Sequence, residues 1–373
     1  MKWLRSLVST ASSLFKSIGC LAVIWGCLSA PLHAQTVTST FAVGIAPNPV
    51  AFSPVGSKAY VGNGNVRTIS VINTVTNTTT SSFPVGNEPV AIAFSPNGTK
   101  AYVANNVDNN ISVINTATNT VTGTIAVGIT PAGIAFSPDG SRAYVAIIAG
   151  GITPGSVWVI DTATDTVILS PITVGTYPQA IGLIPDGSQA YVVNRNDGTV
   201  SVINTATRTV VNTIVVGNGP VAVAISPIGS KAYVTNADDG TVTVINTLAG
   251  NVIGTFNVGT TVPDARSVAF SPDGTRAVVV NGGEDTVSVI DTAIDTVIST
   301  ISVGQAPNNV AFSPDGLKAY VVNRNTNDVS VISFAPVVPP TSAAAPIPTL
   351  SEWAMLLMAS LMGMFAFVRL RRH

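Results

Sequence analysis

One segment of about 42 residues recurs seven times and fills most of this 373-residue chain. Each copy opens on a Val-Gly pair, and successive pairs are 42, 42, 47, 42, 42 and 45 residues apart. A period of this length is typical of a solenoid, a propeller or an array. Every copy holds four short alternating segments bounded by Pro, Gly, Asn and Asp, which in the second copy span 91–95, 101–104, 111–115 and 120–127. Four such strands per copy predict the blade of a β-propeller.

The two ends of the repeated region complement each other. The seventh copy stops after its third strand, at 329–333, whereas an extra fourth strand, 36–43, precedes the first copy. If these segments pair, the last blade is completed from both ends of the chain and no sheet edge stays open at the seam. The sequence therefore predicts an all-β fold, a seven-bladed β-propeller of four-stranded antiparallel blades closed by an N-terminal strand.

Short polar motifs occupy the predicted turns. Ser-Pro-Asp-Gly at 137–140, 271–274 and 313–316 joins first and second strands, because Pro presets φ and Gly accepts a positive φ. A basic residue opens the second strand in six copies, and we expect it to be a solvated side chain beside the turn. These six residues are Lys58, Lys100, Arg142, Lys231, Arg276 and Lys318.

Both ends of the chain carry features of an exported protein. Residues 1–34 begin with basic residues, continue through an apolar run and end on Ala34, as in a secretory signal peptide. Both cysteines, Cys20 and Cys27, fall in this segment, so we expect the exported protein to have no disulfide. A lipoprotein cysteine at Cys27 is the alternative, although bulky Trp25 fits that reading poorly.

The C-terminal region contains a Pro- and Ala-rich linker, 336–346, and a terminal segment, 347–373. That segment starts with Ile347-Pro348-Thr349-Leu350, continues with an apolar run at 353–368 and ends in an Arg cluster. The apolar run predicts a transmembrane helix, and the basic residues after it favour a cytoplasmic C-terminus. The segment resembles the IPTL-type sorting signals, relatives of the PEP-type signals of Gram-negative bacteria, which implies an exosortase-type processing enzyme as partner. A plain membrane anchor is the alternative, and Ala354 stands where that family usually has Gly.

Near-identical tetrapeptides end the second strands, among them Tyr233-Val234-Thr235-Asn236 and its counterparts at 102–105 and 191–194. Through these motifs, the region from about residue 43 to 334 resembles the YVTN-family β-propellers. That family includes surface-layer and other exported proteins, and related propellers include lactonases and quinoprotein-like dehydrogenases. The resemblance implies the fold, but it leaves the function open.

Composition excludes several kinds of chemistry. The two histidines, His33 and His373, lie outside the predicted propeller 35–335. Without histidine, the propeller lacks the commonest general base and the commonest transition-metal ligand. Residues 35–345 carry 11 basic and 17 acidic residues, so nucleic acid is not expected as a partner. We expect neither a metal site nor a cofactor.

The remaining charges gather on one side of the predicted ring. Loops that join second to third strands, and links that join one blade to the next, emerge together on what we term the loop-rich face. This face holds two insertions, 147–156 and 260–267, which we expect to flank the mouth of the central channel. The Asp-Gly pairs at 197–198 and 239–240 are expected to be turns, with calcium ligation as the alternative. The candidate ligand-binding residues are Arg67, Tyr177, Arg195, Asp238, Asp239, Asp264 and Arg266.

Two functional hypotheses follow from these observations. In the first, the chain is an exported, surface-sorted propeller that serves as a binding or structural module at the cell surface or in the extracellular matrix. Its glycan or protein ligand would contact the loop-rich face. In the second, it is a lactonase- or quinoprotein-like enzyme that uses acidic and Arg residues around the channel.

Overall fold

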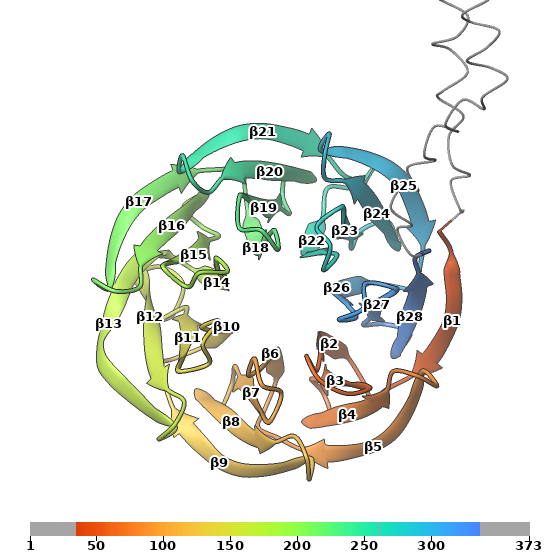
Figure 1. Cartoon of the computed structure of the whole chain (residues 1–373), viewed down its shortest axis with the longest axis horizontal. Coiled ribbons are helices and arrows are strands. Elements are labelled where there is room, and N and C mark those ends of the chain that lie inside the picture. The colour runs from red at the N-terminus through yellow and green to blue at the C-terminus, as the bar shows by residue number, and fades with distance from the viewer. Residues whose placement is uncertain (1–34, 260, 336–373) are drawn as a thin grey trace, which may run out of the picture. The chain divides into compact units, whose positions relative to one another are not determined.

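A computed structural model describes residues 35–259 and 261–335, and this part of the chain forms a ring of seven four-stranded antiparallel sheets (Figure 1). No helix occurs among these residues, so none could cross a membrane. The predicted signal peptide 1–34, linker 336–346 and transmembrane run 353–368 lie outside the described residues. The predicted all-β, seven-bladed propeller is confirmed.

Each blade runs from an inner strand at the channel to an outer strand at the rim. The first blade comprises β2 (Pro47–Phe52), β3 (Lys58–Asn63), β4 (Thr68–Asn73) and β5 (Thr78–Pro84). The second comprises β6 (Pro89–Phe94), β7 (Lys100–Asn105), β8 (Asn110–Asn115) and β9 (Thr120–Ala126). The third comprises β10 (Pro131–Phe136), β11 (Arg142–Ile147), β12 (Pro154–Asp161) and β13 (Thr166–Thr176). The fourth comprises β14 (Pro178–Leu183), β15 (Gln189–Asn194), β16 (Thr199–Asn204) and β17 (Thr209–Val215), and the fifth β18 (Pro220–Ile225), β19 (Lys231–Asn236), β20 (Thr241–Asn246) and β21 (Asn251–Asn257). The sixth comprises β22 (Ala265–Phe270), β23 (Arg276–Asn281), β24 (Thr286–Asp291) and β25 (Thr296–Ser302), and the seventh β26 (Pro307–Phe312), β27 (Lys318–Asn323), β28 (Asp328–Ser333) and β1 (Val37–Ala42).

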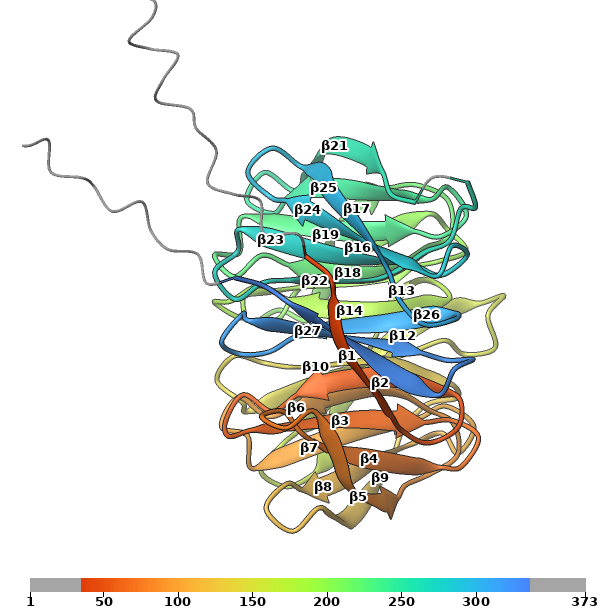
Figure 2. The ribbon, with the colours of Figure 1, turned by 90° about the vertical axis from the view of Figure 1, so that its right-hand side faces the viewer.

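The ring closes as the sequence predicts. Strand β1 pairs antiparallel with β28, with Phe41 opposite Val329 and Ala42 opposite Asp328. Figure 2 shows β1 in red against the blue strands of the last blade. The Phe41 ring also packs edge-on against Tyr320, with ring centroids 5.4 Å apart. All 28 strands pair within Val37–Ser333, so the propeller is self-contained in its strand pairing.

The hydrophobic core lies between neighbouring blades. Alternation places one set of side chains on each face of a strand, and both faces of an inner blade strand are covered by the adjacent blades. The Ala-Tyr-Val run of the second strands is accordingly buried, as at Ala59, Tyr60 and Val61. At the seam, Val61 and Tyr320 belong to one cluster that joins the first and seventh blades. The half-buried Trp158 of β12 packs in the same way between the second and third blades.

The Asn that ends each tetrapeptide packs against the glycine of the Val-Gly pair. Asn105 is fully buried, and its Nδ2 donates to Ser112 Oγ on the third strand at 2.8 Å. A Cβ on Gly86 would lie only 2.6 Å from Asn105 Cγ, so any larger residue would clash with the amide. The same arrangement recurs at Asn323, which donates to Ser330 Oγ at 2.9 Å. The Asn and the Gly recur because this contact holds the link that contains the Val-Gly pair against the end of the second strand.

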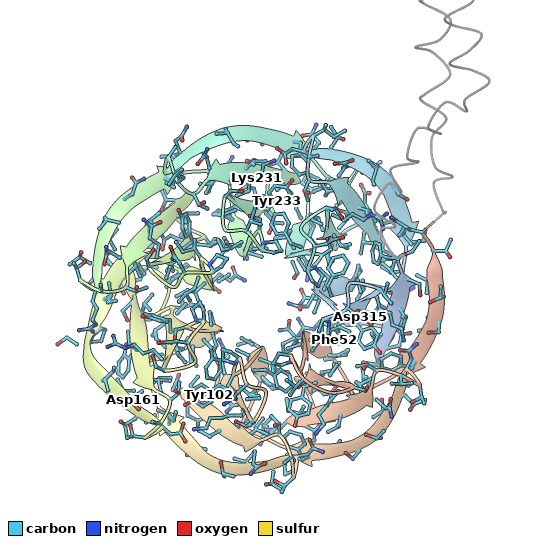
Figure 3. All side chains as sticks on the ribbon, in the orientation of Figure 1. Phe52, Tyr102, Asp161, Lys231, Tyr233 and Asp315 are labelled. Carbon is cyan, nitrogen blue, oxygen red and sulfur yellow. The ribbon has the colours of Figure 1, made fainter. Side chains whose placement is uncertain are left out.

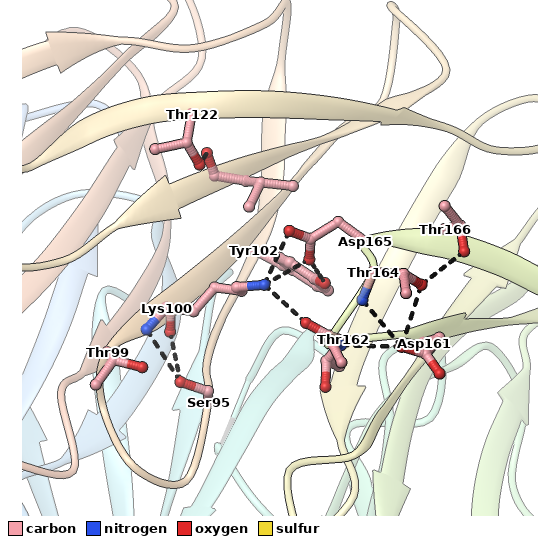
Figure 4. A network of polar contacts seen from close by, with 12 residues as sticks. Ser95, Thr99, Lys100, Tyr102, Thr122, Asp161, Thr162, Thr164, Asp165 and Thr166 are labelled. Atoms are coloured by element: carbon pink, nitrogen blue, oxygen red, sulfur yellow. Dashed lines mark hydrogen bonds and ion pairs between the residues drawn. The ribbon is translucent and has the colours of Figure 1, made fainter.

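The prediction that the basic residues ahead of the second strands are solvated is wrong for the four lysines. Lys100 Nζ lies 2.7 Å from Asp165 Oδ1 and donates to Thr162 O at 2.7 Å, both in the next blade (Figure 4). Tyr102, two residues on and therefore on the same strand face, donates its hydroxyl to Asp165 Oδ1. Burial raises the pKa of Tyr102, and the carboxylate of Asp165 adds to the increase.

This inter-blade clamp, a Lys-x-Tyr pair bound to an Asp or Asn of the next blade, occurs four times. Lys231 and Tyr233, labelled in Figure 3, bind Asp295. Lys58 and Tyr60 bind Asn119, and Lys318 and Tyr320 bind Asn77 across the seam. The clamp therefore supports the ring closure as well as the joints between consecutive blades.

Candidate ligand site at the channel mouth

A cavity of about 640 Å³ occupies the channel at the loop-rich face. Its lining comes from the blade links, the first halves of the inner strands and the loops that follow the second strands. One backbone hydrogen bond recurs at this mouth in all seven blades: the residue after the second strand donates its N–H to the carbonyl of the link residue. Examples are Arg195 N to Tyr177 O at 3.0 Å and Arg324 N to Ala306 O at 3.0 Å.

This repeated bond fixes the backbone and lets the side chains differ. Three positions per blade surround the mouth, and each forms a ring of seven residues. The link ring consists of Ala46, Glu88, Thr130, Tyr177, Gly219, Asp264 and Ala306. The inner-strand ring consists of Asn48, Val90, Ala132, Gln179, Val221, Arg266 and Asn308. The loop ring consists of Gly64, Asn106, Ile148, Arg195, Ala237, Gly282 and Arg324.

The link ring adopts a left-handed backbone in six of the seven blades. Glu88 has a φ of 54° and Tyr177 a φ of 57°, values that non-glycine residues adopt infrequently. The first insertion packs closely against Tyr177, since a Cβ on Gly151 would meet its ring at 3.0 Å. Asn196 Nδ2 donates to Gly151 O at 2.8 Å and fixes the same loop. The half-buried Tyr177 ring therefore belongs to a packed rim beside the cavity.

A polar arc crosses the sixth, seventh and first blades. Arg266 Nε lies 2.9 Å from Asp264 Oδ2, and Arg266 Nη1 donates to Asn308 Oδ1 at 2.7 Å. Asn308 in turn donates through Nδ2 to Asn48 Oδ1. These bonds hold the guanidinium of Arg266 at the wall, while its Nη2 has no hydrogen-bond partner among the described residues. Preorganised donors of this kind suit a carboxylate or phosphate.

Two further guanidinium groups stand at the mouth. Arg195 Nη2 lies 3.6 Å from Asp238 Oδ1, a distance typical of a weak, exposed ion pair. The exposed side chain of Arg324 makes no hydrogen bond or ion pair with any described residue. On the fourth blade, Gln179 Oε1 is buried at the wall and lacks a hydrogen-bond partner within the same part of the chain.

The structure brings four of the seven predicted site residues together around the cavity: Tyr177, Arg195, Asp264 and Arg266. It places the other three elsewhere on the loop-rich face. Arg67 is exposed in a loop beside Asp108, and Asp238 reaches the site only through Arg195. Asp239 accepts hydrogen bonds from Asn218 N at 2.7 Å and Asn218 Nδ2 at 2.9 Å, so it ties its loop to the preceding link.

Other acidic residues on this face also tie their loops to the preceding links. Asp108 accepts from Asn87 through side chain and backbone, and these bonds lower the pKa of its carboxyl. Asp197 accepts from Thr176 N at 2.7 Å. Across residues 35–259 and 261–335, no three His, Cys, Asp or Glu side chains converge as a metal site would require. Residues 195–198 and 237–240 form turns, and the carboxylates of Asp197 and Asp239 accept from backbone N–H groups of the links.

Sequence reasoning missed most of the cavity wall, including Asn48, Gln179, Asn308 and Arg324. A signal for them existed in the alignment of the copies. They occupy two fixed positions, the second residue of the inner strand and the residue that follows the tetrapeptide, and at each of these the seven copies carry five different residue types. The boundaries of the first insertion also need correction: Pro154 to Ser156 already belong to β12, and Ile147 pairs with Ser156.

Comparison with known proteins agrees with this architecture. Residues 147–340, just over half of the chain, match the family model described as "Lactonase, 7-bladed beta-propeller". The chain belongs to this lactonase propeller family. Residues 17–179 match a YNCE-like beta-propeller model, and residues 345–372 match the IPTL-CTERM motif, which confirms the resemblance proposed for the C-terminal segment.

Among solved structures, a chain of Kuenenia stuttgartiensis hydrazine synthase is similar, with a TM-score of 0.71 and 24% sequence identity. The alignment covers 82% of this chain and 99% of that chain, and at this identity the likeness concerns the fold alone. No curated protein matches the chain.

Proposed function

We propose that the chain is an exported, surface-sorted binding module whose ligand occupies the channel mouth. The observation that carries the proposal is the contrast between a constant backbone and variable side chains at the mouth. The same backbone bond recurs at the mouth of every blade, yet the side chains it presents include Tyr177, Arg195 and Arg266 within a single cavity. Variable side chains on a rigid scaffold are the usual basis of ligand recognition.

Export and sorting form the first part of this proposal. The C-terminal motif at 345–372 supports cleavage by an exosortase-type enzyme, with residues 1–34 as signal peptide and 353–368 as a membrane segment before processing. Mass spectrometry of the protein isolated from its native cells tests this point. We expect a mature form that starts at Gln35 and ends before the apolar run. An intact His373 on most molecules would instead indicate a simple anchor.

Ligand recognition forms the second part. We expect a screen of glycans, short peptides and metal ions against the propeller to yield a ligand that depends on the mouth. The doubly substituted variant Arg195→Ala, Arg324→Ala tests this dependence, because Ala237 already occupies the same ring position in the fifth blade. Arg208→Gln, on the opposite turn face, serves as the control. Exchange of 147–156 and 260–267 for the short repeat versions should also abolish binding and leave stability nearly intact. Binding that survives both changes would refute the proposal.

Lactone hydrolysis is the second candidate, and the family match is the observation that favours it. The matched segment 147–340 contains Arg195, Asp264, Arg266 and Arg324, so all the cationic groups of the cavity lie within it. Turnover of aliphatic and sugar lactones separates the two candidates. Hydrolysis that is lost in Asp264→Asn and retained in Arg208→Gln would establish the enzyme, whereas binding without turnover supports the module.

A further inference from the structure

We propose, on the basis of the binding function above, that the ligand is a small amphipathic carboxylate. Its anionic group would contact Arg266 and Arg324, and its apolar chain would cross the channel to the second and third blades. One wall of the cavity carries the cationic groups and the opposite wall carries apolar side chains. This juxtaposition selects a molecule with both an anionic and an apolar group.

The anionic group is specified by the sixth and seventh blades. Arg266 is oriented by Asp264 and Asn308, so its free Nη2 is presented at a fixed place. Arg324 stands in the adjacent blade, and its side chain has no hydrogen-bond or ion-pair partner among the described residues. Because Asp264 neutralises only one of these two cations, one positive charge of the pair remains for a ligand. Guanidinium groups bind carboxylates through charge-assisted hydrogen bonds that are stronger than neutral ones.

The apolar group is specified by the opposite wall. Val90 and Ala132 occupy the inner-strand positions at which the sixth, seventh and first blades carry polar residues, and Ile148 adds a third apolar side chain beside them. Glu88 and Asn106 are the polar lining residues of the second blade on this side. In a seven-membered ring, the third blade lies opposite the joint between the sixth and seventh, and Figure 1 shows β10 across the channel from β22 and β26. The apolar wall therefore faces the cationic one.

Further apolar groups extend this wall onto the rim. Ile152, at the tip of the first insertion, is 91% exposed, and Ile129 in the neighbouring link is 64% exposed. The backbone of the two segments is joined, since Ala149 N donates to Ile129 O at 3.2 Å. A cavity of about 640 Å³ has the size of a small-molecule site, and its convergent polar groups would orient a ligand within it.

The probes are octanoate, its neutral analogue octanamide, and glucuronate, a hydrophilic carboxylate. Calorimetry and ligand-observed NMR measure their binding to the propeller, residues 35–335. Octanoate should bind best, and each methylene removed from it should weaken binding by up to roughly fourfold. Octanamide should bind about tenfold more weakly, because it loses the charged hydrogen bonds.

The variants take residues from sibling blades, so each already fits its position. Val90→Asn copies Asn48 and Asn308, and Arg324→Ala copies Ala237. Each should weaken octanoate binding by about tenfold, whereas octanamide should bind the Arg324→Ala variant as well as it binds the natural protein. Arg208→Gln should bind octanoate as the natural protein does, and thermal unfolding of all variants reports any loss of fold.

Two results would overturn the inference. If glucuronate binds more tightly than octanoate and depends on Arg324, the amphipathic ligand is wrong while binding at the mouth stands. If neither Val90→Asn nor Arg324→Ala alters the binding of any probe, and the ligands found by screening are equally unaffected, both the inference and the proposed binding site fall.

Discussion

At the scale of the residue, the inter-blade clamp shows how one position in a blade determines another in its neighbour. Where the acceptor position of the next blade is Asp or Asn, the preceding blade supplies Lys and Tyr, as with Lys231, Tyr233 and Asp295. Where that position is Gly250, the lysine is replaced by Gln189, and Tyr191 donates to the backbone oxygen of Thr247 at 3.1 Å. The Lys-x-Tyr pair is therefore kept only where the next blade carries Asp or Asn at the acceptor position.

The clamp gives a direct stability prediction. Asp295→Ala would remove the carboxylate that Lys231 and Tyr233 share, leaving Lys231 with only the Thr292 carbonyl, and we expect it to lower the free energy of unfolding by about 1–3 kcal/mol. Asp295→Asn should cost less than half as much, because Asn77 and Asn119 fill this position in other blades. Chemical denaturation of both variants measures the difference. Equal losses would show that the charge, rather than the acceptor geometry, stabilises the joint.

The turn aspartates predict how stability responds to acid. Asp139 accepts from Ser137 Oγ at 2.5 Å and from Ser141 N at 3.0 Å, and these bonds lower its pKa from 3.8 to about 2. Its contribution to stability is therefore complete above about pH 4 and is lost as the pH falls through about 2. Asp139→Asn, which copies Asn97 of the second blade, should flatten the fall of the unfolding temperature in this range. An unchanged slope would contradict the assignment.

At the scale of the element, the strands could be predicted because alternation and turn residues bracket each of them. The predicted second-copy strands agree with β6 to β9 within two residues. The clamp could not be predicted in this way, because strand patterns describe one blade and the clamp depends on how two blades pack. The length of β13, 11 residues at Thr166–Thr176, likewise follows from its pairing with the extended β12 of the first insertion.

The closing strand gives the prediction at this scale. Removal of residues 35–43 would uncover the edge of β28 and the Tyr320 ring, so we expect association through the open edge and a lower unfolding temperature. Size-exclusion chromatography and thermal unfolding measure both effects. Removal of residues 35–36 alone, which precede β1, should have little effect. A monomeric 35–43 deletion with unchanged unfolding would show that the closure is dispensable.

At the scale of the whole molecule, the sequence predicted the ring, its seam and the face that carries the mouth. It could not predict the composition of the cavity, because that depends on which residues of each blade turn toward the axis. Arg67, Asp238 and Asp239 illustrate the limit: they lie on the correct face but outside the cavity lining. Loop positions, charge and the two insertions identified the face, whereas the strand register determines which of its residues line the cavity.

Hydrogen exchange with and without a ligand identified by screening tests the central claim most directly, since it reports on the whole ring at once. We predict increased protection at the link and loop rings, above all around Tyr177, Arg195, Arg266 and Arg324, with the turns at 137–140, 271–274 and 313–316 unchanged. Protection confined to those turns or to the outer strands β9, β17 and β21, with none at the mouth, would contradict the account.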